Sequence, residues 1–139
     1  MTTARDIMHT GATCIGEDQT LLEAAQMMRD LGVGALPICG NDQKLHGIIT
    51  DRDIVIKAVA EGKDLGSCTA AELAQGHVTY VEADTDMEAI VDLMGREQVK
   101  RMPVIQDHRL VGMISEADLA QHLDDAHLSK FVEHVFARP

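Results

Sequence analysis

Leu-His-Gly-Ile-Ile-Thr-Asp-Arg-Asp occupies residues 45–53, and Leu-Val-Gly-Met-Ile-Ser-Glu-Ala-Asp occupies residues 110–118. Each stretch joins an apolar run with a glycine, a hydroxyl residue and, three positions further on, an aspartate. Two occurrences of this pattern in one chain indicate an internal repeat, which has to be recognised before any single motif is interpreted.

The repeat extends over most of the chain. Equivalent positions, at an offset of 66, are Thr13 and Thr79, Met28 and Met94, and Pro37 and Pro103. The offset then falls to 65, because the loop at 41–44 is one residue longer than the loop at 107–109, as expected of a surface turn. We predict a first repeat at 1–68, a second at 69–125 and a helical tail at 126–139.

Composition limits the classes of function. The formal net charge of −11 argues against a nucleic-acid partner, because such binding depends on Lys and Arg neutralising phosphates. No apolar run approaches the roughly 20 residues of a membrane span, and no basic segment followed by an apolar one begins the chain. We therefore expect a cytoplasmic protein with no membrane partner. Three cysteines without C-x-x-C spacing exclude a conventional zinc ribbon.

Hydrophobic periodicity predicts the same order of elements in both repeats, namely strand, helix, strand, strand, helix. The first two strands should run parallel with a right-handed helical crossover, and the last two should form an antiparallel hairpin. The fold class is therefore mixed α/β (α+β). The predicted segments are strands at 13–15, 35–39, 45–49, 79–81, 102–105 and 110–114, and helices at 3–8, 20–31, from 51, 70–74, 86–98 and 116–122.

This order of elements, the duplicated proline-bearing strand and the Gly-x-x-[Ser/Thr]-x-x-Asp ending resemble a tandem pair of cystathionine-β-synthase (CBS) domains. The resemblance covers residues 3 to about 125. It implies two repeats related by a pseudo-twofold axis, with their sheets packed together. The narrower pattern also resembles the stand-alone hypoxic response proteins of actinobacteria, through Thr-Ala-Arg-Asp-Ile-Met at 3–8, Gly-Ala-Leu-Pro-Ile-Cys-Gly at 34–40 and Thr-Asp-Arg-Asp-Ile-Val-Ile-Lys at 50–57.

The hydroxyl residue and aspartate of the repeated motif suit a nucleotide. A helix that starts directly after a strand presents free backbone N–H groups to phosphate, and Asp53, one turn inside, can accept two hydrogen bonds from a ribose diol. The resemblance implies the same use, with an adenosyl ligand such as AMP or ATP and no required cofactor. The candidate ligand contacts are Thr13, Ala35, Leu36, Pro37, Ile48, Thr50, Arg52 and Asp53 in the first repeat, and Thr79, Arg101, Met102, Pro103, Met113, Ser115 and Asp118 in the second.

The same motif has a structural alternative. Thr or Ser followed three residues later by an acid is also a helix capping box, which satisfies free N–H groups without any ligand. The two copies differ in charge, because Arg52 accompanies the first aspartate and Glu116 adds negative charge near the second. Arg101 either contacts a phosphate or pairs with Glu116. We expect any nucleotide to bind more tightly at the first repeat.

Cys14 and Cys39 are candidates for a disulfide. They lie on the first two strands of the first repeat, which the predicted parallel pairing makes neighbours, whereas the equivalent residues of the second repeat are Tyr80 and Ile105. A bond would close a loop of about 25 residues between strands assigned to the ligand site. The alternative is two buried thiols, because cytosolic disulfides are rare.

The tail offers two further hypotheses. His122, His127 and His134 are weak metal candidates, because their spacings do not place two ligands on one helical face. They are either solvated surface residues or ligands of a zinc ion shared between chains. An apolar stripe at 128–136 predicts a helix that packs either on its own core or across a dimer.

No catalytic constellation is present, so the sequence predicts a non-enzymatic protein. We expect a homodimer that senses an adenosyl ligand or redox state, in a stress or hypoxia response, and reports it to an unidentified protein partner. The alternative is a structural or interaction protein with vestigial clefts that acts through macromolecular partners.

Overall fold

A computed structural model describes residues 2–10, 13–42, 44–74 and 78–135. Its contacts define two compact units. The first-repeat unit is made of residues 13–78, and the second-repeat unit of residues 1–12 together with 79–139. Within the described parts of the chain, no helix is long and apolar enough to cross a membrane.

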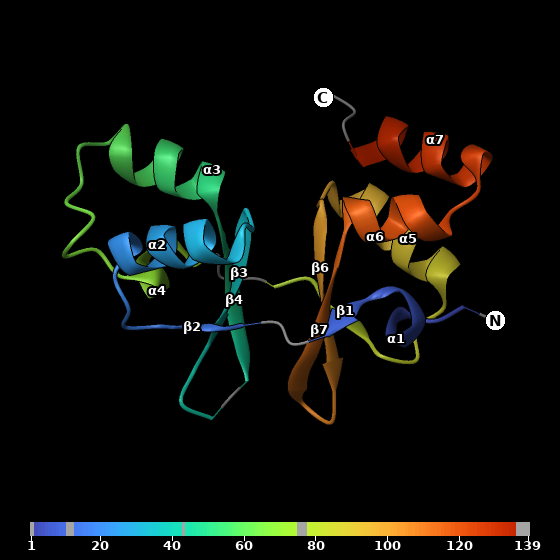
Figure 1. Cartoon of the computed structure of the whole chain (residues 1–139), viewed down its shortest axis with the longest axis horizontal. Coiled ribbons are helices and arrows are strands. Elements are labelled where there is room, and N and C mark those ends of the chain that lie inside the picture. Colours follow the sequence, from blue (N-terminus) through green and yellow to red (C-terminus); the bar gives the residue numbers. More distant parts are fainter. Residues whose placement is uncertain (1, 11–12, 43, 75–77, 136–139) are drawn as a thin grey trace. The chain divides into compact units, whose positions relative to one another are not determined.

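The first-repeat unit is built from β2 (Ile15–Gly16), α2 (Leu21–Leu31), β3 (Ala35–Cys39), β4 (Leu45–Thr50), α3 (Asp51–Asp53), η1 (Ile54–Val59) and α4 (Ala70–Leu73). Its sheet has the order β2–β3–β4, in which β2 runs parallel to β3 and β3 runs antiparallel to β4. Helices α2 and α3 lie on one face of this sheet (Figure 1). The predicted order and strand directions are confirmed.

The second-repeat unit is built from α1 (Ala4–Ile7), β1 (His9–Thr10), β5 (Val81–Glu82), α5 (Met87–Glu97), β6 (Arg101–Gln106), β7 (Arg109–Ser115), α6 (Glu116–His122) and α7 (Asp125–Val135). Its sheet has the order β1–β7–β6–β5. The short strand β1 pairs antiparallel with β7 and has no counterpart among the predicted strands. The rest of the unit repeats the first, with β5 parallel to β6 and β6 antiparallel to β7.

The short leading helices are exchanged between the repeats. Ala4 N donates to Thr85 O at 2.8 Å, and the equivalent Ala70 N donates to Gln19 O, also at 2.8 Å. Each leading helix therefore packs on the repeat that it does not precede in sequence. The compact units consequently differ from the predicted division at residues 68 and 69.

The repeated motif glycine makes room for this exchange. A Cβ placed on Gly47 would lie 3.0 Å from Ala74 Cβ, just after α4. A Cβ placed on the equivalent Gly112 would lie 2.9 Å from the backbone oxygen of His9. Glycine at this position lets the chain that follows each leading helix approach the hairpin closely.

Each unit has its own aliphatic core between its sheet and its helices. In the second-repeat unit α7 completes that core, because Phe131 and Val135 are buried against it together with Ile90 and Met94 of α5. Of the two alternatives for the tail, these residues take the one in which it packs on its own core. Phe136, the last residue of the predicted stripe, lies outside the described residues.

The helix predicted from Asp51 has two parts. Its first turn, α3, is α-helical, and η1 is a π-helix in which Ala60 N donates to Val55 O at 2.9 Å. Three aliphatic side chains of η1 are exposed: Val55 by 54%, Ile56 by 48% and Val59 by 53%. At the offset of 65 their counterparts are Ala120, Gln121 and Asp124. The first-repeat unit therefore keeps an apolar helix surface that the second replaces with small and polar side chains.

Candidate functional site

Thr50 ends β4, and Asp53 lies in the first turn of the helix that follows. Asp53 N donates to Thr50 Oγ1 at 3.0 Å, and Thr50 N donates to Asp53 Oδ2 at 3.1 Å. The other carboxylate oxygen, Oδ1, lies 3.2 Å from Nζ of Lys57, one helical turn further along. The capping alternative is therefore realised in the structure.

Capping alone does not mark a ligand site. Thr20 and Glu23 form the same reciprocal bonds at the start of α2, and they are not part of the repeated motif. What distinguishes Thr50 and Asp53 is their position, at the end of a hairpin whose residues were expected to contact an adenosyl group.

The hairpin register brings most of these residues together. Ala35 is the cross-strand partner of Thr50, and Pro37 is the partner of Ile48. Because partners and alternate residues share a sheet face, these four residues lie on one face that leads to the helix start, on which Pro37 is buried and the other three are half-buried. The second-repeat unit repeats this register, with Arg101 opposite Ser115 and Pro103 opposite Met113. The last candidates, exposed Thr13 and half-buried Thr79, lie shortly before β2 and β5.

Two predicted contacts do not belong to these surfaces. Leu36 is 1% exposed and Met102 is 0% exposed, and each is part of the core of its unit. Because successive side chains of a strand point to opposite faces, Leu36 and Met102 point to the face that the helices cover. Neither side chain is available to a ligand. We therefore leave Leu36 and Met102 out of the proposed sites.

The second motif is more strongly bonded than the first. Oδ2 of Asp118 accepts hydrogen bonds from the backbone N of Ser115 at 2.8 Å and from its hydroxyl at 2.9 Å. Nδ1 of His9, on β1, lies 2.8 Å from the same oxygen. The Asp118 side chain is 19% exposed.

These partners affect the ionisation of Asp118. Burial of the carboxyl group opposes its ionisation, but the Ser115 backbone N–H, the His9 ring and the Ser115 hydroxyl outweigh that effect. The pKa of Asp118 is therefore lowered below its usual value. The structure keeps this carboxylate charged and bonded within its own unit.

The two candidate cations also differ. Nη1 of Arg101 lies 3.1 Å from Oε1 of Glu116, which is the pairing alternative for this arginine. Arg52 is exposed, and no ion pair of its guanidinium is found within the part of the chain that the structure describes. A phosphate at the second motif would have to compete with Glu116 for Arg101.

The three histidines proposed as weak metal ligands are held separately. His122 Nδ1 lies 2.8 Å from the backbone oxygen of Asp118, and His127 Nδ1 lies 2.7 Å from Asp124 Oδ1. Gly95 on α5 leaves room for the side chain of His134. Across residues 2–10, 13–42, 44–74 and 78–135, no cluster of three or more His, Cys, Asp or Glu side chains could hold a metal ion.

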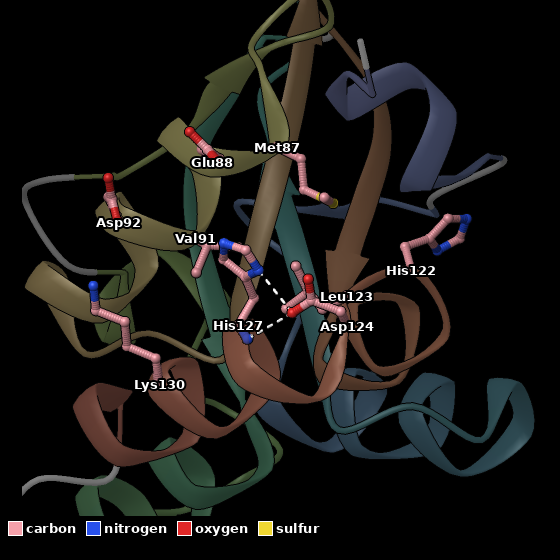
Figure 2. Close-up of a pocket in the computed structure, with 9 residues that line it drawn as sticks. All are labelled: Met87, Glu88, Val91, Asp92, His122, Leu123, Asp124, His127 and Lys130. Carbon is pink, nitrogen blue, oxygen red and sulfur yellow. Dashed lines mark hydrogen bonds and ion pairs between the residues drawn. The ribbon is translucent and has the colours of Figure 1, made fainter.

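His122 and His127 do line a pocket of about 380 Å³ between α5 and the junction of α6 with α7 (Figure 2). Figure 2 shows the His127 ring turned toward Asp124 and His122 set apart from them. The remaining lining residues are Met87, Glu88, Val91, Asp92, Leu123 and Lys130. None of the predicted adenosyl contacts lines this pocket.

Cys14 and Cys39 form a disulfide, with their Cα atoms 5.7 Å apart. The parallel pairing of β2 with β3 brings the two cysteines together, as the sequence predicted. Cys68, half-buried, is the remaining cysteine and is free.

Sequence reasoning missed two partners of the motif aspartates. Lys57 follows Asp53 by four residues, a spacing that is itself a signal for an ion pair on a helix. His9 carries no such signal, because its position depends on β1 joining the sheet of the other repeat.

A family model for the CBS domain matches residues 4–59 and again residues 70–125. The chain belongs to the CBS-domain family. Hypoxic response protein 1 of Mycobacterium tuberculosis is 52% identical to this CBS pair over 135 residues, which cover 97% of the chain and 94% of that relative. The predicted resemblance to the hypoxic response proteins is confirmed.

Two solved structures of CBS proteins are similar to the whole fold. The crystal structure of Hypoxic Response Protein I with two coordinated zinc ions has a TM-score of 0.82 and 54% identity, and the match covers 88% of this chain and all of that one. The CBS domain pair of protein MJ0100, in complex with 5′-methylthioadenosine and S-adenosyl-L-methionine, has a TM-score of 0.78 and 27% identity, with coverage of 86% and 94%.

Proposed function

We propose that this CBS pair is a non-enzymatic regulatory protein that binds an adenosyl nucleotide at the Thr50/Asp53 motif. One observation carries the proposal. Ala35, Pro37 and Ile48 form a single sheet face with Thr50, which ends where the helix with Asp53 begins. An apolar face, the positive end of a helix dipole and a carboxylate suit, in turn, an adenine, a phosphate and a ribose, although the first N–H groups of this helix are bonded within the chain.

The chemistry of recognition follows from these groups. The helix N-terminus and Arg52 would attract the phosphate, and Asp53 would accept hydrogen bonds from the ribose hydroxyls after Lys57 moves aside. An i, i+4 ion pair of this kind contributes only about 0.3–0.5 kcal/mol, so it does not hinder ligand entry. The complex of the similar MJ0100 domain pair with two adenosyl compounds supports an adenosyl ligand as the class of ligand.

Thermal unfolding in the presence of AMP, ATP, 5′-methylthioadenosine and S-adenosylmethionine tests the proposal. A ligand that binds only the folded chain at 100 times its Kd stabilises it by about 2.7 kcal/mol. We expect at least one of these ligands to raise the melting temperature, and Asp53→Ala to remove the effect. If none of them does so, the clefts are vestigial.

The proposal includes a homodimer formed through the first-repeat helices. Apart from Lys57, η1 consists of apolar residues, and apolar helix surfaces are normally buried, yet Val55, Ile56 and Val59 are exposed in the single chain. A second copy offers the same apolar surface, as an isologous contact requires. The dimer would then present its state to an unidentified protein partner.

Redox sensitivity is the second part of the proposal. In the cytoplasm, which we propose as the location, disulfides rarely persist. The bond between Cys14 and Cys39 would therefore report the redox state of its surroundings, and reducing it would loosen the sheet that bears the nucleotide site.

The second candidate function is that of an interaction protein with vestigial clefts. The closed capping boxes and the exposed surface of η1 favour it. Zinc is not part of either proposal, because the described residues provide no cluster that could hold a metal ion.

A further inference from the structure

The ring of His9 contacts the carboxylate of Asp118, which is the group of the second motif that would bind a ribose. Its Nδ1 lies 2.8 Å from Oδ2 of Asp118, which already accepts hydrogen bonds from the backbone N and the hydroxyl of Ser115. An ionised carboxylate has about four lone-pair positions, two on each oxygen. Three donors therefore saturate Oδ2 and leave only Oδ1 for a ligand.

The sheet places His9 on the surface where the ligand would lie. His9 on β1 is the cross-strand partner of Met113 on β7, and Met113 is the partner of Pro103 on β6. Because cross-strand partners point to the same face, the three side chains form one row. Met113 and Pro103 are the second-repeat residues expected to contact the adenosyl group.

The position of β1 is fixed by close packing. A Cβ on Gly112 would lie 2.5 Å from Sδ of Met8 and 2.9 Å from the backbone oxygen of His9. Only a glycine allows this approach, so the backbone that carries His9 is held against β7. The contact between His9 and Asp118 therefore depends on the fixed backbone of β1, and not on a long, flexible side chain as at Lys57.

Asp53 is held differently. Within the described residues, its contacts outside the capping box come from Lys57, a long side chain on its own helix. The residue equivalent to His9 at the offset of 66 is Gln75, which lies outside the described residues. Among the described residues, a ligand at Asp53 has one solvent-exposed lysine to displace, whereas a ligand at Asp118 has to displace a histidine anchored on a strand.

We propose that His9 determines which of the two motifs accepts a nucleotide, by closing Asp118 to the ribose diol. This inference rests on the proposed function. It deepens that function, because it limits each chain to one adenosyl ligand, bound at Thr50/Asp53. Removing the imidazole takes away the ring that contacts Oδ2 and opens the second motif to a ribose.

Calorimetric titration of the full chain with AMP tests the inference. We expect one AMP per wild-type chain and two per His9→Ala chain, with affinity at the second site raised about tenfold or more, as the release of one hydrogen bond predicts. His9→Thr, whose shorter side chain suits a strand and does not reach Asp118, should behave in the same way. Thermal unfolding checks that both variants are folded.

Three controls make the result specific. His122→Ala removes a histidine that contacts only the backbone oxygen of Asp118, so it should leave one site. Asp118→Ala added to His9→Ala should return the stoichiometry to one. The new site should also fail to bind 2′,3′-dideoxyadenosine monophosphate, which lacks the diol.

Two results would overturn the inference and leave the proposed function in place. They are two equal AMP sites in the wild-type chain, or one site in both His9 variants. If no protein binds AMP, the proposed function fails for this nucleotide and the inference fails with it.

Discussion

The first and second repeats carry the same motif in the same sheet register, but they use it differently. In the first, Asp53 is bonded only by its own capping box and Lys57, as far as the described residues extend. In the second, Asp118 is bonded by Ser115 and by His9 from an exchanged segment. Two copies of one motif therefore differ in the partners of their aspartates, and in our proposal these partners decide which aspartate is available to a ligand.

The helices of the two repeats also differ in how much apolar surface they expose. In the second-repeat unit α7 packs on α5 and buries Phe131, and the exposed positions of α6 are small or polar. In the first-repeat unit η1 keeps its aliphatic side chains exposed. Among the described residues, the first repeat thus exposes more apolar helix surface than the second, and we propose that it is the one open to a ligand and to a partner.

The largest expected effect on stability comes from α7, which covers the core of the second-repeat unit. Phe131→Ala should lower the free energy of unfolding by about 3–5 kcal/mol, because it leaves a cavity in the second-repeat core. Urea denaturation measures the change. Val132→Ala, at an exposed position on the same helix, should change it by less than about 0.5 kcal/mol. Equal effects of the two variants would show that α7 does not pack as described.

The next effect concerns the disulfide, which only the first repeat contains. Reduction of Cys14–Cys39 should lower the free energy of unfolding by about 3 kcal/mol, because the cross-link closes a loop with a sequence separation of 25. Thiol titration of denatured, unreduced protein should find one free thiol per chain, that of Cys68. Three free thiols in protein purified without reductant would rule out the bond and the redox proposal.

A third effect concerns the apolar helix. Val55→Asp places a charge in the proposed dimer contact and should weaken dimerisation by about 2 kcal/mol, or roughly 30-fold in the dimer Kd. Analytical ultracentrifugation measures this constant. Ala120→Asp, at the equivalent position of α6, is the matched control and should leave the dimer Kd unchanged. An unaffected dimer in Val55→Asp would place the interface elsewhere.

The smallest effect concerns the pH dependence of stability. Because the pKa of Asp118 is lowered in the folded chain, its contribution is fully present above the unfolded pKa near 3.9 and is lost as the pH falls through the folded value. The stability difference between wild type and Asp118→Asn should therefore shrink between about pH 5 and pH 3. Urea denaturation at several pH values measures this difference, and a constant value would contradict the assigned contacts.

Much of the architecture was predictable because the sequence is repeated. The strand order, the parallel pairing that brings Cys14 to Cys39, and the capping of the helix at Thr50 follow from local patterns. The exchange of leading helices does not, because Ala4 and Ala70 fit either repeat equally well by pattern. The π-helical turn at η1 also has no sequence signal that we can identify.

The candidate site was predicted in part for the same reason. Strand periodicity was sufficient to place Ala35, Pro37 and Ile48 on one face, and applying it strictly would have removed Leu36. His9 could not be predicted, because β1 is two residues long and its pairing depends on the exchange. Whether Arg101 meets a phosphate or Glu116 required coordinates.

Calorimetric titration of AMP into Asp53→Ala and Asp118→Ala, beside the wild type, tests most directly the claim that the first repeat is the open one. Loss of charge-assisted hydrogen bonds to the ribose should weaken binding to Asp53→Ala by about 1.5–3 kcal/mol, or roughly 10- to 150-fold. Asp118→Ala should bind AMP with nearly the wild-type Kd. The reverse order, or equal losses in both variants, would contradict the account.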